Sequence, residues 1–598
     1  MKLSDYVAQF LVDQGVKHVF MLVGGAAMHL NESIGSSQQL VYVSNLHEQA
    51  CSIAAESYAK YDNRLGVAVV TAGPGGTNAI TGLAGAWLDS TPVLFISGQV
   101  KRADLKGDSG VRNMGPQELD LPTLVSSVTK YGATVTDPNA IRYHFEKAVH
   151  LATTGRPGPV WIEIPLDVQA AQIDPESLAG YDPDPPNLRA GEADLQEAAA
   201  AVLDLLAAAE RPFLLFGNGV RLAGAVEELR QLLDAVEAPF GLTWPALDLV
   251  PDEYPRLVGR PGPMAPRAPN FAMQNSDFFL SIGARLDLVF TAFAPERLAR
   301  GARKVMVDID PAEISKLEPY LELGICADAR EFLRELAGQA RDRDVPSFQP
   351  WSERCAAWKE RYPLVDVEAP ASGRVSMYSF TESLCDALPE GALVVPGSSG
   401  SAVETLLLAY RARAGQRVFI TTGLGSMGLG LPAAIGACLA HDRRPTVCIE
   451  GDGGFQMNSQ ELEVLSRLQL PVKLFVIENG GYSSIVTSQS AYFDHLVGAT
   501  PESGLTLPDT LALASAYGLP TDSIEDQAEV ADGIRRVLGG QGPVVCRVRA
   551  IPDEPRQPRV ASYEKPDGSM ASRPLEDMYP FLSRDEFLAN MIVPPVPE

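Results

Sequence analysis

Long apolar runs are missing from this sequence of 598 residues. No stretch reaches the roughly 18 consecutive apolar residues that a membrane-spanning helix requires. The opening residues, 1–6, carry an acid early and lead into a helix-like pattern, which is not typical of a secretion signal. These absences predict a cytoplasmic protein that has no membrane partner.

Positive charge is also scarce. The chain has 49 Lys and Arg against 75 Asp and Glu, and its formal net charge is −26. A surface of this sign repels phosphate backbones and anionic lipid, so we expect no nucleic-acid partner. An anionic substrate would have to be held by positive charge gathered locally.

Paired cysteines are absent. The seven cysteines are scattered without CxxC spacing, and several lie in apolar runs. This pattern is typical of small core residues in a reducing compartment and gives no sign of a disulfide framework.

The composition is ordinary for a globular α/β protein, and the length exceeds what one core supports. Helical and apolar-strand patterns alternate, which predicts three doubly wound parallel-sheet domains. Stretches rich in proline interrupt them around 174–191 and 345–350. We therefore divide the chain into residues 1–175, a central domain at 190–345, a third domain at 370–550, and an extended C-terminal tail at 551–598 that wraps the body and covers the active site.

Two glycine-rich turns follow two apolar runs in the third domain. Residues 447–449 lead into Gly451-Asp452-Gly453-Gly454, and residues 472–477 lead into Glu478-Asn479-Gly480-Gly481. Both runs predict buried parallel strands. Between them Asn458 is a candidate helix N-cap, with Glu461 three residues on and leucines at 462, 465 and 468 marking one apolar face.

A right-handed crossover places these two turns side by side at the carboxyl ends of their strands, where open α/β sheets bind ligands. A carboxylate from Asp452, an amide oxygen from Asn479 and a free backbone carbonyl suit a hard cation, and glycine amides approach phosphate oxygens closely. The sequence therefore predicts Mg²⁺ carrying a diphosphate. The alternative is that both stretches are only turns, because Gly, Asp and Asn dominate turns.

The joint pattern, with 25 residues between Gly453 and Asn479, resembles the thiamin-diphosphate motif. Two stretches earlier in the chain resemble the acetolactate synthase branch of the thiamin-diphosphate enzymes: HEQA and VVTAGPGGTNAITGLAGAWLDSTPVLFISGQV. The resemblance covers nearly the whole chain. It implies Mg²⁺ ligands at Asp452, Asn479 and Gly481. It implies cofactor contacts at Gly75, Asn78, Gly400, Ser401, Met427, Asp452, Gly453, Gly454, Asn479, Gly481 and Tyr482.

The resemblance assigns the acid–base role to Glu48, which in the family hydrogen-bonds the pyrimidine ring nitrogen of the cofactor. Without that context, Glu48 would be a surface residue favoured by the helix dipole. Gln117 matches a family residue near the reacting centre, although Pro116 replaces the usual Phe before it. Thr77 is a candidate N-cap after the loop that contains Gly75.

In the acetolactate synthase branch the central domain binds FAD. Gly283, Arg285, Asp308 and Asp328 match positions near the flavin. However, the family run Arg-Phe-Asp-Asp-Arg appears here as residues 285–289, RLDLV, and so lacks its second acid and second arginine. The alternative is an empty structural domain.

The resemblance implies a decarboxylating carboligase that takes a 2-oxo acid, most simply pyruvate, and joins the product to a second carbonyl compound. Ser401 and Ala402 replace the family Gln and His near the reacting centre, so the acceptor stays open. The alternatives are a cyclic 1,2-diketone hydrolase, a simple 2-oxo acid decarboxylase, and a regulatory subunit that only binds cofactor. Glu48 and Asp452 come from different subunits in the family, which implies a homodimer or homotetramer.

Overall fold

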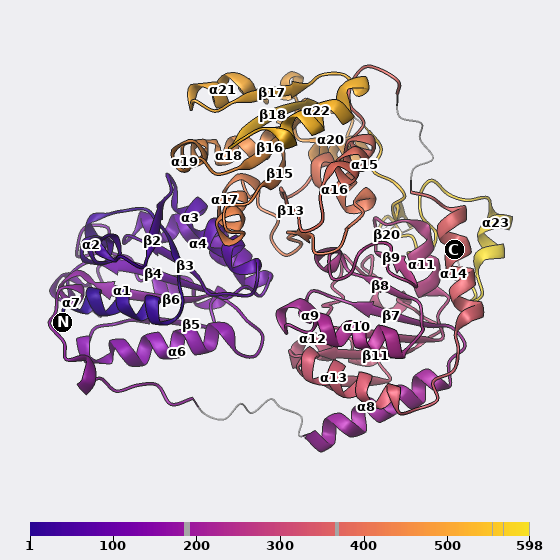
Figure 1. The fold of residues 1–598 in the computed structure, drawn as a ribbon, viewed down its shortest axis with the longest axis horizontal. Helices are drawn as coiled ribbons and strands as arrows, with labels where there is room; N and C mark the ends of the chain where they lie inside the picture. Colours follow the sequence, from indigo (N-terminus) through magenta and orange to yellow (C-terminus); the bar gives the residue numbers. More distant parts are fainter. Residues whose placement is uncertain (184–191, 365–369, 553, 566, 597–598) are drawn as a thin grey trace.

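The computed structural model describes residues 1–183, 192–364, 370–552, 554–565 and 567–596. Three domains follow one another, and each is built on a six-stranded parallel sheet with helices packed against it (Figure 1). The predicted fold class is confirmed. The predicted linker at 174–191 lies partly outside the described residues, which stop at 183 and resume at 192.

The first sheet has the strand order β2-β1-β3-β4-β6-β5. Its central strands form because short runs of β-branched and aromatic residues are buried completely, as in β3 and β4. The strands are β1 His18–Met21, β2 Val41–Ser44, β3 Gly66–Val70, β4 Val93–Gln99, β5 Tyr131–Thr134 and β6 Val160–Pro165. The helices are α1 Leu3–Asp13, α2 Met28–Ser36, α3 Glu48–Lys60, α4 Pro74–Leu88, α5 Leu121–Leu124, α6 Ile141–Thr153 and α7 Leu166–Gln169.

The central sheet has the order β12-β11-β10-β7-β8-β9. The strand order reverses between β7 and β10, which makes the loops after these two parallel strands the expected ligand crevice. The strands are β7 Pro212–Phe216, β8 Phe240–Leu242, β9 Leu257–Gly259, β10 Phe278–Ile282, β11 Arg303–Asp308 and β12 Leu323–Cys326. The helices are α8 Glu192–Ala207, α9 Gly219–Leu222, α10 Val226–Ala235, α11 Arg267–Gln274, α12 Pro311–Ser315, α13 Ala329–Arg341 and α14 Gln349–Arg361.

The third sheet, β14-β13-β15-β16-β18-β17, repeats the strand order of the first. Its reversal falls between β13 and β15. The strands are β13 Leu393–Pro396, β14 Arg417–Val418, β15 Thr446–Gly451, β16 Val472–Glu478, β17 Thr521–Ile524 and β18 Val544–Arg549. The helices are α15 Met377–Ala387, α16 Ser401–Ala409, α17 Gly430–Ala440, α18 Asp452–Met457, α19 Leu462–Leu468, α20 Ser483–Tyr492, α21 Thr510–Ala516 and α22 Val530–Gly539.

Two predicted helix caps are wrong. Asn458 lies at the predicted position, just before the 3₁₀ turn Ser459–Glu461 that leads into α19, but it makes no capping hydrogen bond because its Oδ1 accepts from Gln460 Nε2 at 3.0 Å. Thr77 lies inside α4, which begins at Pro74 because proline at the first position already has the helical φ. The helix at Thr77 therefore starts earlier than the polar residue suggested, whereas at Asn458 only the capping bond is missing.

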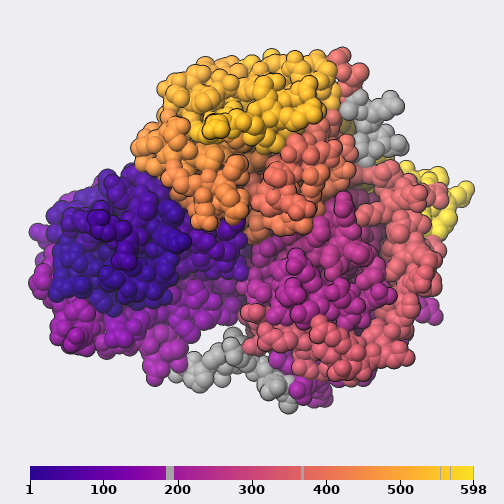
Figure 2. All heavy atoms as spheres, in the orientation of Figure 1, coloured from indigo at the N-terminus to yellow at the C-terminus, as the bar shows by residue number. Residues whose placement is uncertain are grey.

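The first and third domains share one apolar core. On the surface the two domains adjoin, the first in indigo and the third in orange (Figure 2). Helices α3 and α17 meet so closely that a Cβ on Gly436 would overlap the backbone carbonyl of Ala54. Ser57 Oγ donates to the carbonyl of Ala433 at 2.7 Å across the same contact. Buried side chains from both domains fill this core, among them Phe20, Phe95, Trp161, Leu393, Ile435 and Leu474.

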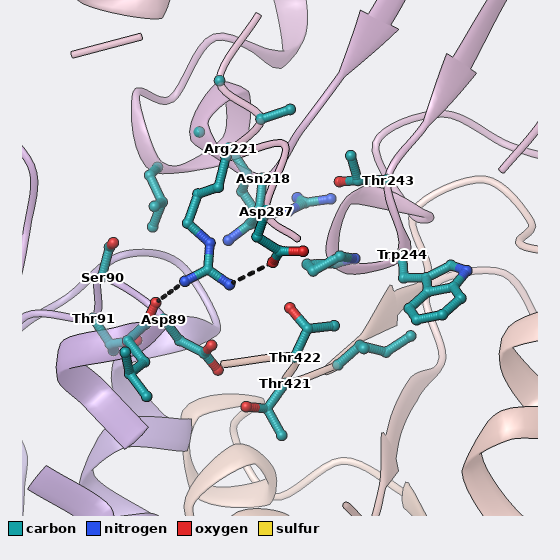
Figure 3. A pocket seen from close by; sticks show the side chains of 18 of the residues that line it. Asp89, Ser90, Thr91, Asn218, Arg221, Thr243, Trp244, Asp287, Thr421 and Thr422 are labelled. Carbon is teal, nitrogen blue, oxygen red and sulfur yellow. Dashed lines mark hydrogen bonds and ion pairs between the residues drawn. The ribbon is translucent and has the colours of Figure 1, made fainter. Parts of the chain in front are cut away.

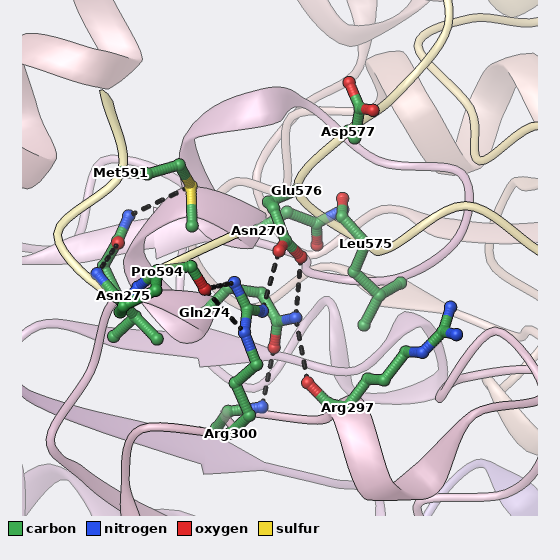
Figure 4. A network of polar contacts seen from close by, with 12 residues as sticks. Asn270, Gln274, Asn275, Arg297, Arg300, Leu575, Glu576, Asp577, Met591 and Pro594 are labelled. Atoms are coloured by element: carbon green, nitrogen blue, oxygen red, sulfur yellow. Dashed lines mark hydrogen bonds and ion pairs between the residues drawn. The ribbon is translucent and has the colours of Figure 1, made fainter. Parts of the chain in front are cut away.

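The tail packs on the central domain rather than lying extended over the whole body. It forms a hairpin, β19 Ser562–Glu564 with β20 Met570–Ser572, and ends in α23 Arg584–Asn590. Figure 4 shows how polar side chains hold it. The buried carboxylate of Glu576 pairs with Arg300 at 2.7 Å and accepts from Gln274 Nε2 at 2.8 Å.

Near its start the tail also reaches the third domain. Arg556 pairs with Glu404 at 2.9 Å and donates to Ser483 Oγ at 3.3 Å.

Within the described part of the chain, no helix is both long and apolar enough to cross a membrane.

Candidate active site

A cavity of about 110 Å³ opens in the third domain at the reversal between β13 and β15. All of its lining residues fall between 398 and 485. They include nine residues that the sequence predicted as cofactor contacts: Gly400, Ser401, Met427, Asp452, Gly453, Gly454, Asn479, Gly481 and Tyr482. The topology therefore gathers the two glycine-rich turns at one place, as the motif spacing predicts.

Asp452 and Asn479 lie at the ends of adjacent strands, since Gly451 pairs with Ile477 in the sheet. Both side chains are buried, with 7% and 8% of their surface exposed. Asp452 Oδ1 accepts from the Gly453 amide at 2.8 Å, and burial raises the pKa of Asp452 to about 7. A carboxyl group in such surroundings gains most from a cation beside it.

The side-chain amide of Asn479 forms a hydrogen bond through its nitrogen but not through its oxygen. Its Nδ2 donates to Ser401 Oγ at 2.8 Å, while its buried Oδ1 has no hydrogen-bond partner among the described residues. A buried acceptor left unpaired is costly, and a bound ion removes that cost. Among the described residues, no three or more His, Cys, Asp or Glu side chains are grouped so that they could hold a metal ion. The donor set here is therefore one carboxylate, one amide oxygen and backbone carbonyls. Such a set fits Mg²⁺ that draws further ligands from a phosphate.

Backbone conformation and close packing require the glycines of these turns. Gly481 has φ of +135°, which only glycine adopts readily, and this conformation turns the chain after Asn479. A Cβ on Gly453 would overlap the ring of Tyr482 and would lie against the Met427 side chain. Gly400, at φ +78°, precedes α16, and the amide of Ser401 donates to Ser483 Oγ at 3.4 Å.

A buried acid that the sequence did not predict as a site residue lines this cavity. Glu450 accepts from the amides of Gly430 at 2.7 Å and Gly451 at 3.2 Å, and burial raises the pKa of Glu450 to about 7. A Cβ on Gly397, Gly430 or Gly454 would overlap its carboxylate. The sequence carried a signal for it, since a charged residue interrupts an otherwise apolar strand just before the GDGG turn.

Glu48, Gly75 and Asn78 come together in the first domain. α3 begins at Glu48, and His47 caps it by accepting the Gln49 amide at its Nδ1, 3.0 Å away. Glu48 is 7% exposed, and Asn78 Nδ2 donates to its Oε2 at 3.0 Å. Gly75 faces the same carboxylate from the first turn of α4. These residues are separate from the cavity at Asp452, whose lining belongs wholly to the third domain.

Gln117 lies beside this cluster with its side chain exposed. Its φ of +61° is unusual for a residue with a side chain, and its backbone packs against Gly73, where a Cβ would overlap its carbonyl. The Gln117 backbone therefore lies against Gly73, the residue that precedes α4.

A larger cavity of about 410 Å³ lies where the three domains meet (Figure 3). Asn218, Thr243 and Trp244 of the central domain face Asp89 of the first domain and Thr421 of the third across it. The loops after β7 and β10 contribute to its wall, which is the crevice that the strand order predicts. The four residues predicted near a flavin all line it: Gly283, Arg285, Asp308 and Asp328.

The polar groups of this cavity are partly engaged already. Arg285 donates to the carbonyl of Leu88 at 3.1 Å and lies 3.5 Å from Asp287. Burial raises the pKa of Asp308 to about 6, and Asp328 caps α13 by accepting the Arg330 amide at 2.8 Å. Leu288 and Val289, which replace the family acid and arginine, are exposed.

Comparison with known proteins matches each domain to a family model. The thiamine pyrophosphate enzyme N-terminal TPP binding domain matches residues 1–124, the central domain matches 199–336, and the C-terminal TPP binding domain matches 398–548. Among curated relatives, the probable acetolactate synthase large subunit of Methanocaldococcus jannaschii is 31% identical over 592 residues, covering 95% of each chain.

Two further relatives cover most of the chain. The acetolactate synthase isozyme 2 large subunit of Escherichia coli is 32% identical, covering 91% of this chain and 95% of its own. The chloroplastic acetolactate synthase 1 of Zea mays is 31% identical, covering 91% of this chain and 85% of its own. Since these relatives span all three domains and both glycine-rich turns, the chain belongs to the thiamine pyrophosphate-dependent enzymes, as an acetolactate synthase-like member of that family.

Proposed function

We propose that this enzyme decarboxylates a 2-oxo acid, with pyruvate as the simplest donor, and joins the resulting two-carbon unit to a second carbonyl compound. The observation that carries the proposal is the buried Glu48 carboxylate at the start of α3, held by Asn78, in a chain that also has the Asp452 and Asn479 site. A cofactor-binding subunit without activity would have no use for a buried acid at that position.

The residues divide the work between two ends of a bound cofactor. Asp452, Asn479 and the Gly481 carbonyl would hold Mg²⁺, and Gly453 and Gly454 would admit the diphosphate. When bound, thiamin diphosphate supplies the carbon nucleophile and accepts the electron pair as carbon dioxide leaves. Burial of Asp452 keeps water away from this end and strengthens its attraction for the metal.

Glu48 would act at the other end. Its carboxyl group would exchange a proton with the pyrimidine ring nitrogen, which is general acid–base catalysis carried out through the cofactor. The hydrogen bond from Asn78 fixes the carboxylate orientation, and Gly75 lets the pyrimidine approach because no side chain stands in front of Glu48. Met427 would contact the same ring from the third domain.

The site requires two chains in this proposal. Glu48 belongs to the first domain, whereas the cavity at Asp452 is lined by third-domain residues alone. A homodimer that brings Glu48 of one chain to Asp452 of the other completes the site, and a homotetramer contains two such dimers. Exposed apolar side chains around β2, including Val41 and Tyr42, provide surface for this contact.

The direct test supplies purified protein, Mg²⁺ and thiamin diphosphate with pyruvate and a panel of aldehyde and ketone acceptors. We expect mass spectrometry to show an acceptor that has gained the two-carbon unit, together with released carbon dioxide. Free aldehyde without any adduct would instead identify a simple decarboxylase. A ring-opened acid from a cyclic 1,2-diketone would identify a hydrolase, and no turnover of any donor would remove the proposal.

We also propose that the large cavity binds FAD. Its volume lies in the roughly 300–1,000 Å³ range of ligand pockets, and it sits at the strand reversal where dinucleotides bind. Asp308, at the end of β11, would accept a ribose hydroxyl. The amides of Gly217 and Gly219 already donate to protein carbonyls, so the pyrophosphate would depend on side chains such as Arg285.

We expect FAD to copurify with the protein, at least in part. Heat-released ligand should show the flavin absorbance spectrum, and Arg285→Ala should lower the bound fraction because it removes the cation beside the proposed pyrophosphate. Exposed Arg303→Ala, in the same domain, is the matched control. If protein incubated with excess FAD holds no flavin, the change to Leu288 and Val289 has closed the site.

A further inference from the structure

A buried carboxylate of the third domain is hydrogen-bonded to the loop that precedes Glu48. Glu461, at the end of the short 3₁₀ turn Ser459–Glu461, accepts from Asn45 Nδ2 at 2.8 Å and from the Leu46 amide at 2.9 Å. Glu461 and Asn45 are both fully buried. Each oxygen of the carboxylate is therefore used on residues of the first domain.

The contact between the first and third domains does not require a buried acid at position 461. The first and third domains are already joined by the apolar contact of α3 with α17, where Ser57 and Gly436 fit closely. A buried carboxylate costs free energy that an apolar side chain at position 461 would avoid. Burial also raises the pKa of Glu461 to about 7. Since the buried Glu461 carboxylate costs free energy and is not needed to join the domains, we infer that its hydrogen bonds serve to fix the geometry of the loop.

The loop in question determines the position of Glu48. Asn45 ends the connection from β2, where its amide donates to the Met21 carbonyl at 3.1 Å, and α3 begins three residues later. Asn45 and Leu46 together set the direction in which His47 and Glu48 enter the helix. A shift of the loop would rotate the first turn of α3 and turn Glu48 away from Asn78.

The same acid is tied to the metal end of the third domain. The segment that starts at Asp452 runs through α18 and the 3₁₀ turn to Glu461. It is fixed midway by Asn458, whose Nδ2 donates to the carbonyl of Gly428, next to Met427. This path joins the proposed metal ligand to the proposed acid–base residue within one chain.

We propose that Glu461 is the positioning residue for Glu48: it orders the loop of residues 45–47 so that the first turn of α3 presents the Glu48 carboxylate to the pyrimidine. The proposal rests on the proposed function. Because Glu48 of one chain serves the metal site of the other, Glu461 also links the metal end of one active site to the acid–base end of its neighbour.

The test compares four variants, Glu461→Ala, Glu461→Gln, Asn45→Asp and the double variant Asn45→Asp/Glu461→Gln. Glu461→Ala leaves Asn45 and the Leu46 amide without acceptors. Glu461→Gln retains both contacts, since its oxygen serves Leu46 and its amide meets the Asn45 oxygen once that side chain turns over. Asn45→Asp places two carboxylates together. The double variant restores the bond between positions 45 and 461 with donor and acceptor exchanged, and the Leu46 amide again donates to a side-chain oxygen.

Two quantities are measured on each variant. Amide hydrogen exchange of the peptide containing Leu46, in the protein without cofactor, reports the order of the loop. Deuterium exchange at the thiazolium carbon of bound thiamin diphosphate reports the placement of Glu48. We expect Glu461→Ala and Asn45→Asp to lose amide protection and to slow the thiazolium exchange roughly 10–100-fold, the loss typical of an outer positioning partner. Glu461→Gln and the double variant should match the unmodified protein, and cofactor affinity should hold in all four.

The proposal is overturned if Glu461→Ala retains both amide protection and exchange rate, or if the double variant behaves like Asn45→Asp. It is equally overturned if exchange falls only in step with cofactor affinity, since that pattern reflects general loss of structure. Should the unmodified protein not accelerate thiazolium exchange at all, the proposed function fails, and the amide measurement still decides whether Glu461 orders the loop.

Discussion

Replacing Asp452 with alanine is expected to abolish Mg²⁺-dependent binding of thiamin diphosphate. The substitution removes the anionic ligand from a site whose other donors are neutral, the Asn479 oxygen and backbone carbonyls. The dication and the diphosphate would then face each other without the carboxylate that holds the metal in the protein. We expect affinity to fall by at least about 100-fold, the upper end of the loss when an outer partner of a metal ligand is removed.

Isothermal titration of Mg²⁺ and thiamin diphosphate measures this loss directly. Asp532→Ala is the matched control, because Asp532 lies on the solvent-facing side of α22 in the same domain and pairs with exposed Arg535. Such a surface pair contributes about 0–1 kcal/mol to stability, so binding should be unchanged. An Asp452→Ala protein that binds the cofactor with the affinity of the unmodified protein would remove the metal site from this account.

Replacing Glu48 with glutamine should separate binding from chemistry. Glutamine keeps the size of the side chain and one hydrogen bond with Asn78, but it has no carboxyl group to exchange a proton with the pyrimidine. Affinity for thiamin diphosphate should fall only modestly. Deuterium exchange at the thiazolium carbon should slow by about 10²–10⁴-fold, the usual contribution of general acid–base catalysis.

Quenched NMR of the bound cofactor follows this exchange without knowledge of the acceptor. Glu353→Gln, an exposed residue of α14, is the control and should exchange at the original rate. Equal rates in Glu48→Gln and the unmodified protein would sink the role given to Glu48. This variant also sets the largest effect that a residue acting through Glu48, such as Glu461, could produce.

The order of the sheets and the site at the glycine-rich turns could be predicted from the sequence because their causes are local. A buried strand is a short apolar run, and the turn after it carries Gly, Asp and Asn within a few residues. The end of β15 at Gly451 and the end of β16 at Glu478 follow directly from such runs. The turns after β15 and β16 lie side by side because these strands are neighbours in the sheet, and the rule of right-handed crossovers predicts this arrangement.

Glu450 and Glu461 escaped prediction because their partners are distant along the chain. Glu450 receives the Gly430 amide from the preceding helix, and Glu461 meets Asn45 across a domain boundary. The capping bond assigned to Asn458 is absent because its Oδ1 accepts from Gln460 Nε2 while its Nδ2 donates to the distant Gly428 carbonyl. A sequence shows which residues can form a hydrogen bond, and only the fold determines which pairs come within reach.

The shared core of the first and third domains has a consequence for synthesis of the chain. Ala54 and its neighbours on α3 are complete early, but α17, which covers them, begins only at Gly430. The intervening central domain must be translated first, which at ordinary rates takes on the order of tens of seconds. During that interval the face of α3 that α17 later covers has no partner from its own chain, although α3 already packs on α4 and β3. We therefore expect the newly made N-terminal domain to expose this apolar surface to chaperones until the ribosome finishes the rest.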